Sequence, residues 1–378
     1  MKILLVAMPS LHFYRWSEQL QAAGHELYWF NITDGGAAVS RIDFMRQKYG
    51  WKLKWDYPGR TFVKAKFPKL YTFLQKFNEN NTTQVFENYV NEVQPDVVHS
   101  FALYVSCTPI LPVMEKFPKL KWIFSSWGSD LYYFQNIPAY LTDIKRVLPR
   151  VNYLFTDCYR DYHIAKSYGF QGEFLGVFPG GGGFDLEKIR QYKQPIEQRK
   201  TIAIKGFQGR SGRAIEVLKA IILVKEEVKD YEIVVFGSDK EVFDFANQNG
   251  LPTWKNFSIQ GKLPHAAVLE IFGKSLFYIG NSNSDGMPNT LLEAICCEVF
   301  PIQSNPGNVT AEIINDGVNG FLISNEEDIS EIARTIKKAL SLPTEKIISG
   351  VQTYQTKIHN LDFYKVKEQV IACYKKLE

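Results

Sequence analysis

Residues 281–300 read NSNSDGMPNTLLEAICCEVF, and the organisation of the chain can be worked out from this stretch. Before it, the apolar run 275–280 predicts a buried parallel strand. After the glycine–methionine–proline break, we expect a helix from Asn289, with apolar residues on one side and Glu293 on the other. A loop between a strand's carboxyl end and a helix's amino end presents unpaired N–H groups and a positive dipole end. The stretch therefore predicts an anion site that suits a phosphate.

Two carboxylates, Asp285 and Glu293, flank the start of this helix. They can accept hydrogen bonds from sugar or ribose hydroxyls while the loop amides hold a phosphate. The alternative is that Asp285 only caps the helix or turn and that Glu293 is a solvated helix residue. On the pair alone, that alternative is favoured.

The longer string is much more specific than the pair. The run SDGMPNTLLEA at 284–294, followed by P-I and by EIINDGVNGFL at 312–322, resembles the donor-site signature of glycosyltransferase family 4, the group 1 glycosyl transferases. Those enzymes are retaining, adopt the GT-B fold and carry an acidic pair in E-x7-E, of which Asp285 replaces the first glutamate. The resemblance implies that Asp285 holds the donor sugar and that further residues bind the donor: Gly286, Met287, Pro288, Asn289, Thr290 and Glu293.

Length and composition set the outer bounds. The 378 residues, 45% hydrophobic and 22% charged, suffice for two soluble domains. No run is long enough to span a membrane, and the first residues read as a strand, not as a signal peptide. Five cysteines without metal-ligand spacing indicate a reducing compartment, hence the cytoplasm. No metal motif is present, so we expect no metal and no cofactor. The net charge of +4 is too small to indicate nucleic acid.

The charge is unevenly distributed. Between positions 41 and 76, ten lysines and arginines stand against Asp43 and Asp56, a local balance of +8, and aromatic residues are interleaved with them. This pattern suits an anionic membrane surface or an anionic lipid-linked acceptor. It also suits single-stranded nucleic acid, by stacking and charge. The third alternative is a solvated face whose aromatic residues pack inward.

The first half alternates strands and helices, with strands at 2–7 and 26–32, and so begins as a Rossmann-like domain. Its resemblance to the same family is looser. Where the family has a glycine-rich loop and two histidines near the acceptor, this chain offers candidates at the ends of three strands, the second histidine being replaced by Trp127. The candidates on the acceptor side are Ser10, His12, Arg15 and Ser129, and His99 and Asp130 are candidate catalytic residues beside them. Asp130 either orients an acceptor hydroxyl or caps the following helix.

The four glycines at 180–183 predict a flexible hinge, with a linker to about residue 200. We therefore expect an acceptor domain at 1–184, a donor domain at 185–360, and a final helix at 361–378 that packs back on the first domain. The basic glycine-rich loop after the strand at 201–204 can neutralise a diphosphate. Its candidates are Lys205, Arg213 and, third, Arg210. The turn at 257–265 resembles the family's base-reading turn, with Lys262 and Leu263 acting through their main chain.

Taken together, the sequence predicts an α/β protein of the GT-B class, with two Rossmann-like doubly wound domains facing a central cleft. The expected activity is retaining, metal-independent transfer of a sugar from a UDP- or GDP-sugar to a glycan or lipid-linked acceptor. Cell-surface polysaccharide or lipopolysaccharide synthesis at the inner membrane face is the expected setting. The alternatives are a sugar-nucleotide epimerase, a catalytically idle relative, and a two-domain solute-binding protein.

Overall fold

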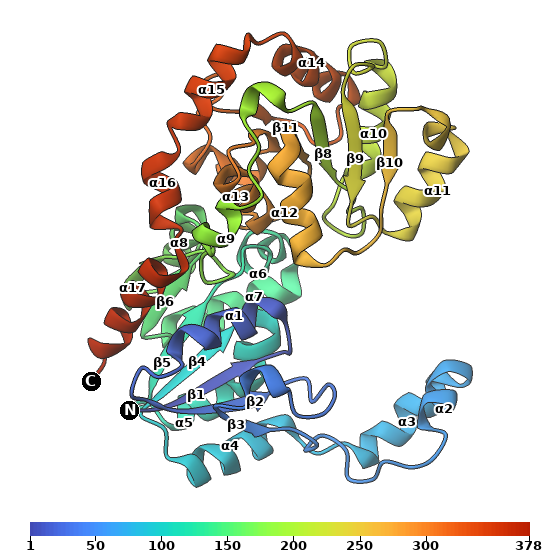
Figure 1. The fold of residues 1–378 in the computed structure, drawn as a ribbon. Coiled ribbons are helices and arrows are strands. Elements are labelled where there is room, and N and C mark those ends of the chain that lie inside the picture. The colour runs from blue at the N-terminus through green and yellow to red at the C-terminus, as the bar shows by residue number, and fades with distance from the viewer. The chain divides into compact units, whose positions relative to one another are not determined.

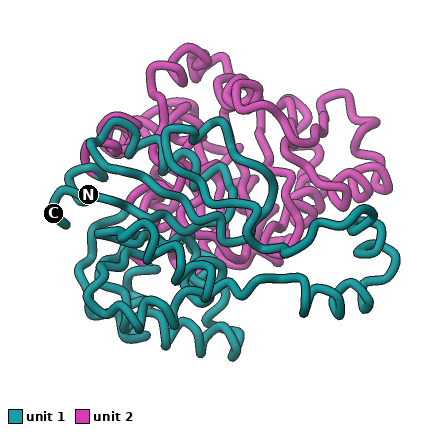
Figure 2. The backbone as a smooth tube through the Cα atoms, turned by 90° about the horizontal axis from the view of Figure 1, so that it is seen from below, with its two compact units in different colours: residues 1–156, 161–177, 370–378 teal, residues 157–160, 178–369 magenta.

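The computed structural model describes residues 1–378, and the chain falls into two compact units, each built on its own sheet (Figure 2). Unit 1 comprises residues 1–156, 161–177 and 370–378, and unit 2 comprises residues 157–160 and 178–369. Both sheets are parallel and both carry the 3-2-1-4-5-6 strand order of a Rossmann-like domain. The predicted fold class, two doubly wound α/β domains, is confirmed.

Unit 1 contains a seven-stranded sheet in the order β3-β2-β1-β4-β5-β6-β7 (Figure 1). Its strands are β1 (Lys2–Ala7), β2 (Glu26–Asn31), β3 (Arg46–Lys48), β4 (Val97–Phe101), β5 (Lys121–Ser125), β6 (Tyr153–Thr156) and β7 (Glu173–Val177). Its helices are α1 (Leu11–Leu20), α2 (Arg60–Lys66), α3 (Pro68–Asn78), α4 (Thr82–Val93), α5 (Leu111–Lys116), α6 (Ser129–Tyr132), α7 (Pro138–Val147) and most of α8 (Tyr159–Ser167).

Local sequence explains how unit 1 begins. In β1, every residue after Lys2 is buried, as expected for a parallel strand covered by helices on both faces. The side chain of Ser10 then accepts a hydrogen bond from the Phe13 amide at 3.2 Å and so caps α1. Because β1 and β4 pair in parallel, their carboxyl ends meet at one edge of the sheet.

The segment 370–378 belongs to unit 1, although unit 2 separates it from the rest of that unit. It forms the end of α17 (Phe363–Lys375) and buries Tyr374 completely. The Tyr374 hydroxyl is hydrogen-bonded to Nδ1 of His99 and accepts a bond of 3.3 Å from Nε1 of Trp16. A residue from the end of the chain therefore completes the core of the first unit.

Unit 2 contains a six-stranded sheet in the order β10-β9-β8-β11-β12-β13. Its strands are β8 (Thr201–Lys205), β9 (Glu232–Phe236), β10 (Phe257–Ile259), β11 (Ser275–Gly280), β12 (Phe300–Ser304) and β13 (Phe321–Ile323). Its helices are α9 (Leu186–Arg190), α10 (Ala214–Leu223), α11 (Lys240–Gln248), α12 (His265–Lys274), α13 (Asn289–Cys296), α14 (Ile329–Leu340), α15 (Thr344–Gln352), α16 (Gln355–Asn360) and the start of α17. No helix is both long and apolar enough to cross a membrane.

The expected flexible hinge at 180–183 is instead packed. Residues 181–184 are buried, and the Phe184 amide donates to the Leu361 carbonyl at 2.8 Å while its own carbonyl accepts from Phe363 at 2.9 Å. Gly183 has φ +87°, and a Cβ there would lie 2.9 Å from the Leu361 carbonyl oxygen. Gly183 is therefore needed for close backbone approach, which local sequence cannot distinguish from flexibility.

The basic and aromatic segment divides in two. Trp51 is buried and stacks on Phe30, with ring centroids 5.0 Å apart. Beyond it, α2 and α3 form an arm that extends away from the remainder of unit 1 (Figures 1 and 2). Its large apolar side chains are mostly exposed, so the alternative in which the aromatic residues pack inward is wrong for the arm.

Candidate functional site in unit 2

A cavity of about 170 Å³ lies where the strand order of the unit 2 sheet reverses, between β8 and β11. Ligands of doubly wound sheets bind at this switch point, beyond the carboxyl ends of the strands. The lining comes from the ends of β8, β11 and β12 and from the loops after β8 and β11: Lys205, Phe207, Ser211, Tyr278, Gly280, Asn281, Ser282, Asp285, Pro288 and Gln303.

Buried polar atoms without a partner face this cavity. The Tyr278 hydroxyl and Oε1 of Gln303 make no hydrogen bond, and neither do the Ser282 hydroxyl and Oδ1 of Asn281. A Cβ added to Gly280 would lie 2.2 Å from the Gln303 oxygen and 2.5 Å from the Tyr278 oxygen, so both atoms crowd the glycine. Because an unsatisfied buried polar group costs about 1–3 kcal/mol, these atoms favour a ligand rich in hydroxyl or phosphate oxygens.

Electrostatics keep the Tyr278 hydroxyl protonated. Burial raises its pKa, and the neighbouring carboxylates of Asp285 and Glu293 raise it further. A protonated phenol can donate a hydrogen bond to a ligand oxygen and accept one from a hydroxyl.

The three predicted basic residues occupy different surroundings. Lys205, at the end of β8, is half-buried, lines the cavity and forms no ion pair. Nε of Arg213 instead donates to Glu327 at 3.0 Å, and its Nη1 donates to the Gly212 carbonyl at 2.7 Å. Arg210 is exposed in the intervening loop. Lys205 is therefore the cation that the fold presents to a ligand in the cavity.

The loop before α13 is held by residues that sequence reasoning did not identify. The Arg160 guanidinium donates to the Asp285 carbonyl at 2.8 Å and to the Pro306 carbonyl at 2.9 Å. A Cβ on Gly286 would lie 2.1 Å from a carboxylate oxygen of Asp157, so that carboxylate packs directly on the glycine. Neither Asp157 nor Arg160 lies in a motif of its own, and no local signal marks them.

The predicted helix does begin at Asn289, directly after Pro288, and no side chain caps its start. Its first turn, Asn289 and Thr290 included, therefore presents amide groups to an anion. Glu293 is buried, and its Oε1 lies 2.9 Å from Nε2 of His265 at the start of α12. The alternative in which Glu293 is a solvated helix residue is therefore wrong.

His265 was missed as a site residue, although it closes the turn that the sequence singled out. Of the two residues predicted in that turn, Lys262 is exposed and Leu263 is half-buried against the unit 2 core. Met287 packs on the same core cluster.

In unit 1, the predicted acceptor-side residues lie near the carboxyl ends of β1 and β5. Ser10 serves as the α1 cap, while His12 is exposed with its ring 5.8 Å from that of Trp127. Arg15 and Ser129 are half-buried. An acceptor contact by these residues stays a prediction.

His99 cannot touch an acceptor directly, which corrects its assignment as a catalytic residue. It is fully buried, with Nδ1 bonded to Tyr374 and Nε2 lying 2.7 Å from the Ser125 hydroxyl. Burial holds its pKa well below the ordinary value, so it stays neutral. The sequence located the strand end correctly, but the side chain points into the core.

Asp130 is also buried, and it joins two loops of unit 1. Its carboxylate accepts hydrogen bonds from the Leu103 amide at 2.9 Å, the Trp127 amide at 3.0 Å and the Ser126 hydroxyl at 3.0 Å. The Ser126 hydroxyl also bonds to Asp161 at 2.9 Å. Burial, followed by the nearby Asp161 charge, raises the pKa of Asp130 to about 6. The geometry therefore gives Asp130 a positioning role, and contact with an acceptor stays a prediction.

Residues 186–350 match the family model of glycosyl transferases group 1, which confirms the resemblance for this segment. No curated protein matches the sequence. Among solved structures, sucrose-phosphate synthase from Thermosynechococcus elongatus is similar, with a TM-score of 0.72, 15% identity and coverage of 100% of this chain and 99% of that chain. HepE from Anabaena, solved with UDP and glucose, is similar with a TM-score of 0.66 and 12% identity, covering 100% of both chains. A glycosyltransferase from Rickettsia africae gives a TM-score of 0.67 and 16% identity, covering 100% of this chain and 98% of that one. The fold is thus that of the GT-B glycosyltransferases.

Proposed function

We propose that this chain, with its group 1 glycosyl transferase match at residues 186–350, transfers a sugar from a nucleotide-diphosphate sugar bound in the unit 2 cavity. One observation carries the proposal. At the switch point of a Rossmann-like sheet, an unpaired cation, a carboxylate and buried polar atoms without partners converge on one cavity. That combination suits a ligand with a diphosphate at one end and hydroxyls at the other.

The difficulty of the reaction is charge. When the bond between the sugar and the diphosphate breaks, the electron pair leaves with the diphosphate and the sugar becomes positively charged. Lys205 and the amides at the start of α13 would stabilise the departing anion. The acceptor hydroxyl attacks from the same face, and its proton passes to an oxygen of the leaving diphosphate. No protein nucleophile is needed, and the configuration at the sugar is retained.

The remaining contacts follow from the placement of the two carboxylates. Asp285 would hold the sugar hydroxyls, and Tyr278 and Gln303, which line the same cavity, would form further hydrogen bonds to them. Glu293 would accept hydrogen bonds from the ribose diol, and its contact with His265 fixes its side chain for that purpose. Main-chain atoms near Lys262 and Leu263 would read the base.

Uridine diphosphate is the first nucleotide to test. The similar structures include HepE in complex with UDP-glucose and an Escherichia coli trehalose-6-phosphate protein bound with UDP-2-fluoro glucose. GDP-sugars remain the second choice. We further propose a glycan or lipid-linked acceptor in polysaccharide or lipopolysaccharide synthesis, a cytoplasmic protein peripheral to the inner membrane face, and turnover that needs no metal. Activity that persists in EDTA would support the last point.

Two other functions share the same donor site. An epimerase would release nucleotide and a free sugar without an acceptor, and an idle relative would bind nucleotide without turnover. The replacement of the first family glutamate by Asp285, and of the family histidine by Trp127, motivates the idle alternative. Product analysis with and without acceptor separates all three.

The test is a thermal-shift and nucleotide-release screen against UDP-, GDP-, ADP- and CMP-sugars. We expect one nucleotide family to raise the melting temperature of the wild type and to be released slowly. Lys205→Ala should lose most of this stabilisation, because a charge-assisted contact with phosphate is worth about 1.5–3 kcal/mol, or about 10- to 100-fold in affinity.

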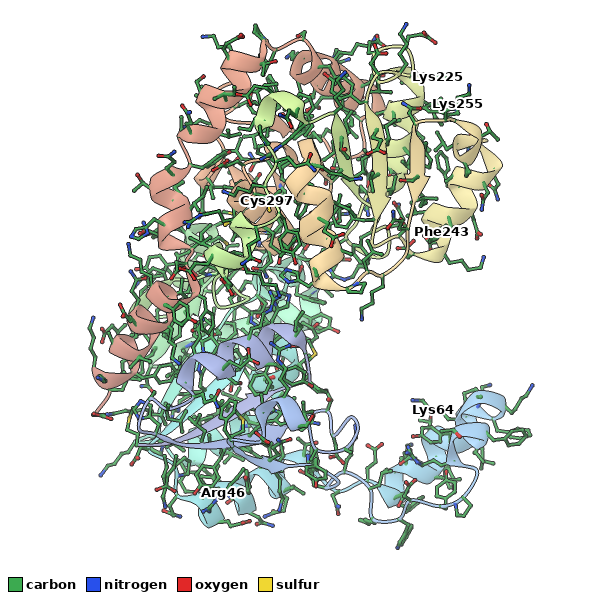
Figure 3. All side chains as sticks on the ribbon, in the orientation of Figure 1. Arg46, Lys64, Lys225, Phe243, Lys255 and Cys297 are labelled. Atoms are coloured by element: carbon green, nitrogen blue, oxygen red, sulfur yellow. The ribbon has the colours of Figure 1, made fainter.

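Lys255→Ala is the matched control, because Lys255 is exposed on the same unit and does not line the cavity (Lys255 is labelled in Figure 3). It should bind like the wild type. Equal losses in both variants, or no stabilisation by any nucleotide sugar, would overturn the site assignment.

A further inference from the structure

The arm comprises residues 55–78, and its base is fixed to unit 1 by backbone and side-chain hydrogen bonds. Asn78 Oδ1 accepts from the Trp55 amide and its Nδ2 donates to the Trp55 carbonyl, both at 2.9 Å. The Lys54 amide donates to the Asn78 carbonyl at 2.8 Å, and the Asn80 amide donates to the Lys52 carbonyl at 2.8 Å. These bonds close the excursion at its base, so the two helices are held on a defined support.

Helix α3 has one covered face and one uncovered face. Tyr71, Leu74, Gln75 and Asn78 are half-buried or buried and follow helical spacing along one side. Leu70, Phe73 and Phe77 follow the same spacing along another side, where they are 50%, 57% and 60% exposed. Phe73 and Phe77 contact each other edge to face, with ring centroids 5.5 Å apart. The uncovered side is therefore a continuous apolar stripe.

Helix α2 and the turns beside it add further exposed apolar side chains to the arm. Phe62 and Phe67 are 60% and 54% exposed and pack edge to face, and Trp55 at the base is 64% exposed. No residue of α2 is buried. A soluble protein rarely leaves so many large apolar side chains exposed in one place without a partner.

The arm is also strongly basic. It carries Arg60, Lys64, Lys66, Lys69 and Lys76 against the single acid Asp56, a balance of +4 that equals the net charge of the whole chain. Asp56 is paired with Arg60 at 2.8 Å, which leaves the four lysines without an acidic partner (Lys64 is labelled in Figure 3). The rest of the chain is therefore electrically balanced, and the excess positive charge is concentrated where the aromatic residues are exposed.

We propose that the arm is a docking surface for an anionic lipid membrane, with the apolar stripe of α3 inserted at the headgroup level and the lysines contacting anionic headgroups. Aromatic residues that alternate with lysines on a short amphipathic helix suit the membrane interface, where apolar and charged groups are both satisfied. The excess positive charge of the arm favours an anionic partner. A polar polyanion would leave the apolar stripe exposed to water, whereas a lipid membrane can bury it.

Membrane docking itself does not depend on the proposed function. Its consequence does: if the chain is a glycosyltransferase with a lipid-linked acceptor, the arm brings the enzyme to the surface that contains that acceptor.

The experiment is flotation of the full chain with vesicles of phosphatidylcholine alone and of phosphatidylcholine mixed with phosphatidylglycerol. We expect binding only to the mixed vesicles, weakening as salt is added. Lys69→Ala/Lys76→Ala should weaken binding about 25-fold, at about fivefold for each lysine. Phe73→Ser/Phe77→Ser should weaken it by at least tenfold while leaving the melting temperature unchanged, because both side chains are already exposed.

Two control variants lie in unit 2. Lys255→Ala removes an exposed lysine and Leu223→Ser removes a 59% exposed apolar residue, and both should float like the wild type. Equal binding to both kinds of vesicle, or losses shared by the controls, would overturn the proposal.

Other binding partners of the arm would give different results in these experiments. Loss of a dimer in the Phe73→Ser/Phe77→Ser variant, with no flotation by the wild type, would identify a second copy as the partner. Binding to a single-stranded oligonucleotide without flotation would identify nucleic acid. Nucleotide-sugar binding measured on the same samples separates sugar transfer from membrane docking. Flotation without nucleotide-sugar binding defeats only the proposed sugar transfer, and nucleotide-sugar binding without flotation defeats only membrane docking by the arm.

Discussion

Because Gly286 and Asp157 are in contact, adding one methyl group at Gly286 should lower both stability and turnover, and a second substitution at Asp157 should restore part of the lost stability. In Gly286→Ala the new Cβ would lie 2.1 Å from one carboxylate oxygen of Asp157 and 2.4 Å from the other. A normal carbon–oxygen separation requires a movement of about 1 Å, either by the buried carboxylate or by the donor loop. Overpacking of this kind costs about 1–3 kcal/mol, and misplacement of a catalytic loop by about 1 Å can lower turnover about 100-fold.

A double-mutant cycle tests this reasoning. Asp157→Ala removes the three atoms that lie closest to the new methyl group. The double variant Gly286→Ala/Asp157→Ala should therefore be more stable, by at least about 1 kcal/mol, than the sum of the two single-variant effects predicts. The free energy of unfolding from urea titration and the turnover of the transferase are the two measurements.

Gly261→Ala is the control, because a Cβ there meets its neighbours only at 3.9 Å. It should leave the free energy of unfolding nearly unchanged. Additivity within about 0.5 kcal/mol, together with normal turnover in Gly286→Ala, would refute the idea that the carboxylate and the loop are in contact.

Three further predictions concern other parts of the molecule. The folded-state pKa of Asp130 lies above its unfolded value, so this residue's contribution to the free energy of unfolding is complete below about pH 4 and falls by up to about 3 kcal/mol as the pH rises through 6. In urea titrations at several pH values, the difference in unfolding free energy between the wild type and Asp130→Asn should follow that trend, and a pH-independent difference would contradict it. Tyr278→Phe removes a buried hydroxyl that has no hydrogen-bond partner, so it should leave the melting temperature unchanged or raise it. Donor binding, measured by calorimetry, should weaken, and unchanged binding would show that the hydroxyl does not face the ligand. Asn78→Ala breaks both bonds to Trp55, so proteolysis between residues 52 and 80 should accelerate without loss of donor binding, whereas an unchanged cleavage rate would show that the base is held by other contacts.

Sequence reasoning succeeded where the signal is local. The apolar run of β11, the break at Pro288 and the start of the helix at Asn289 all fall within residues 275–289, and their order alone places a loop at a sheet edge. The basic glycine-rich loop directly follows β8, and this local pattern is sufficient to predict Lys205 as a ligand-binding residue. His99 shows what a local pattern cannot predict. A strand assignment gives a residue's position along the strand but not whether its side chain faces the core or the ligand.

The residues that sequence reasoning missed act across long separations. Arg160 is 125 positions from the Asp285 carbonyl that it holds, and His265 is 28 positions from Glu293. Nothing near either residue indicates the partner. The arm was flagged by its composition, yet an outward apolar stripe has the same 3–4 spacing as one that faces a core. Only the tertiary contacts show that Phe73 and Phe77 are exposed.

The burial of Tyr374 beside His99 has a consequence for biosynthesis. The two residues are 275 positions apart, and the whole of unit 2, residues 157–160 and 178–369, lies between them in the sequence. A ribosome therefore delivers all the strands of the first sheet long before it delivers the aromatic side chain that fills that sheet's core. The core of unit 1 therefore cannot be completed until the whole of unit 2 has been synthesised, although unit 1 supplies the first residues of the chain.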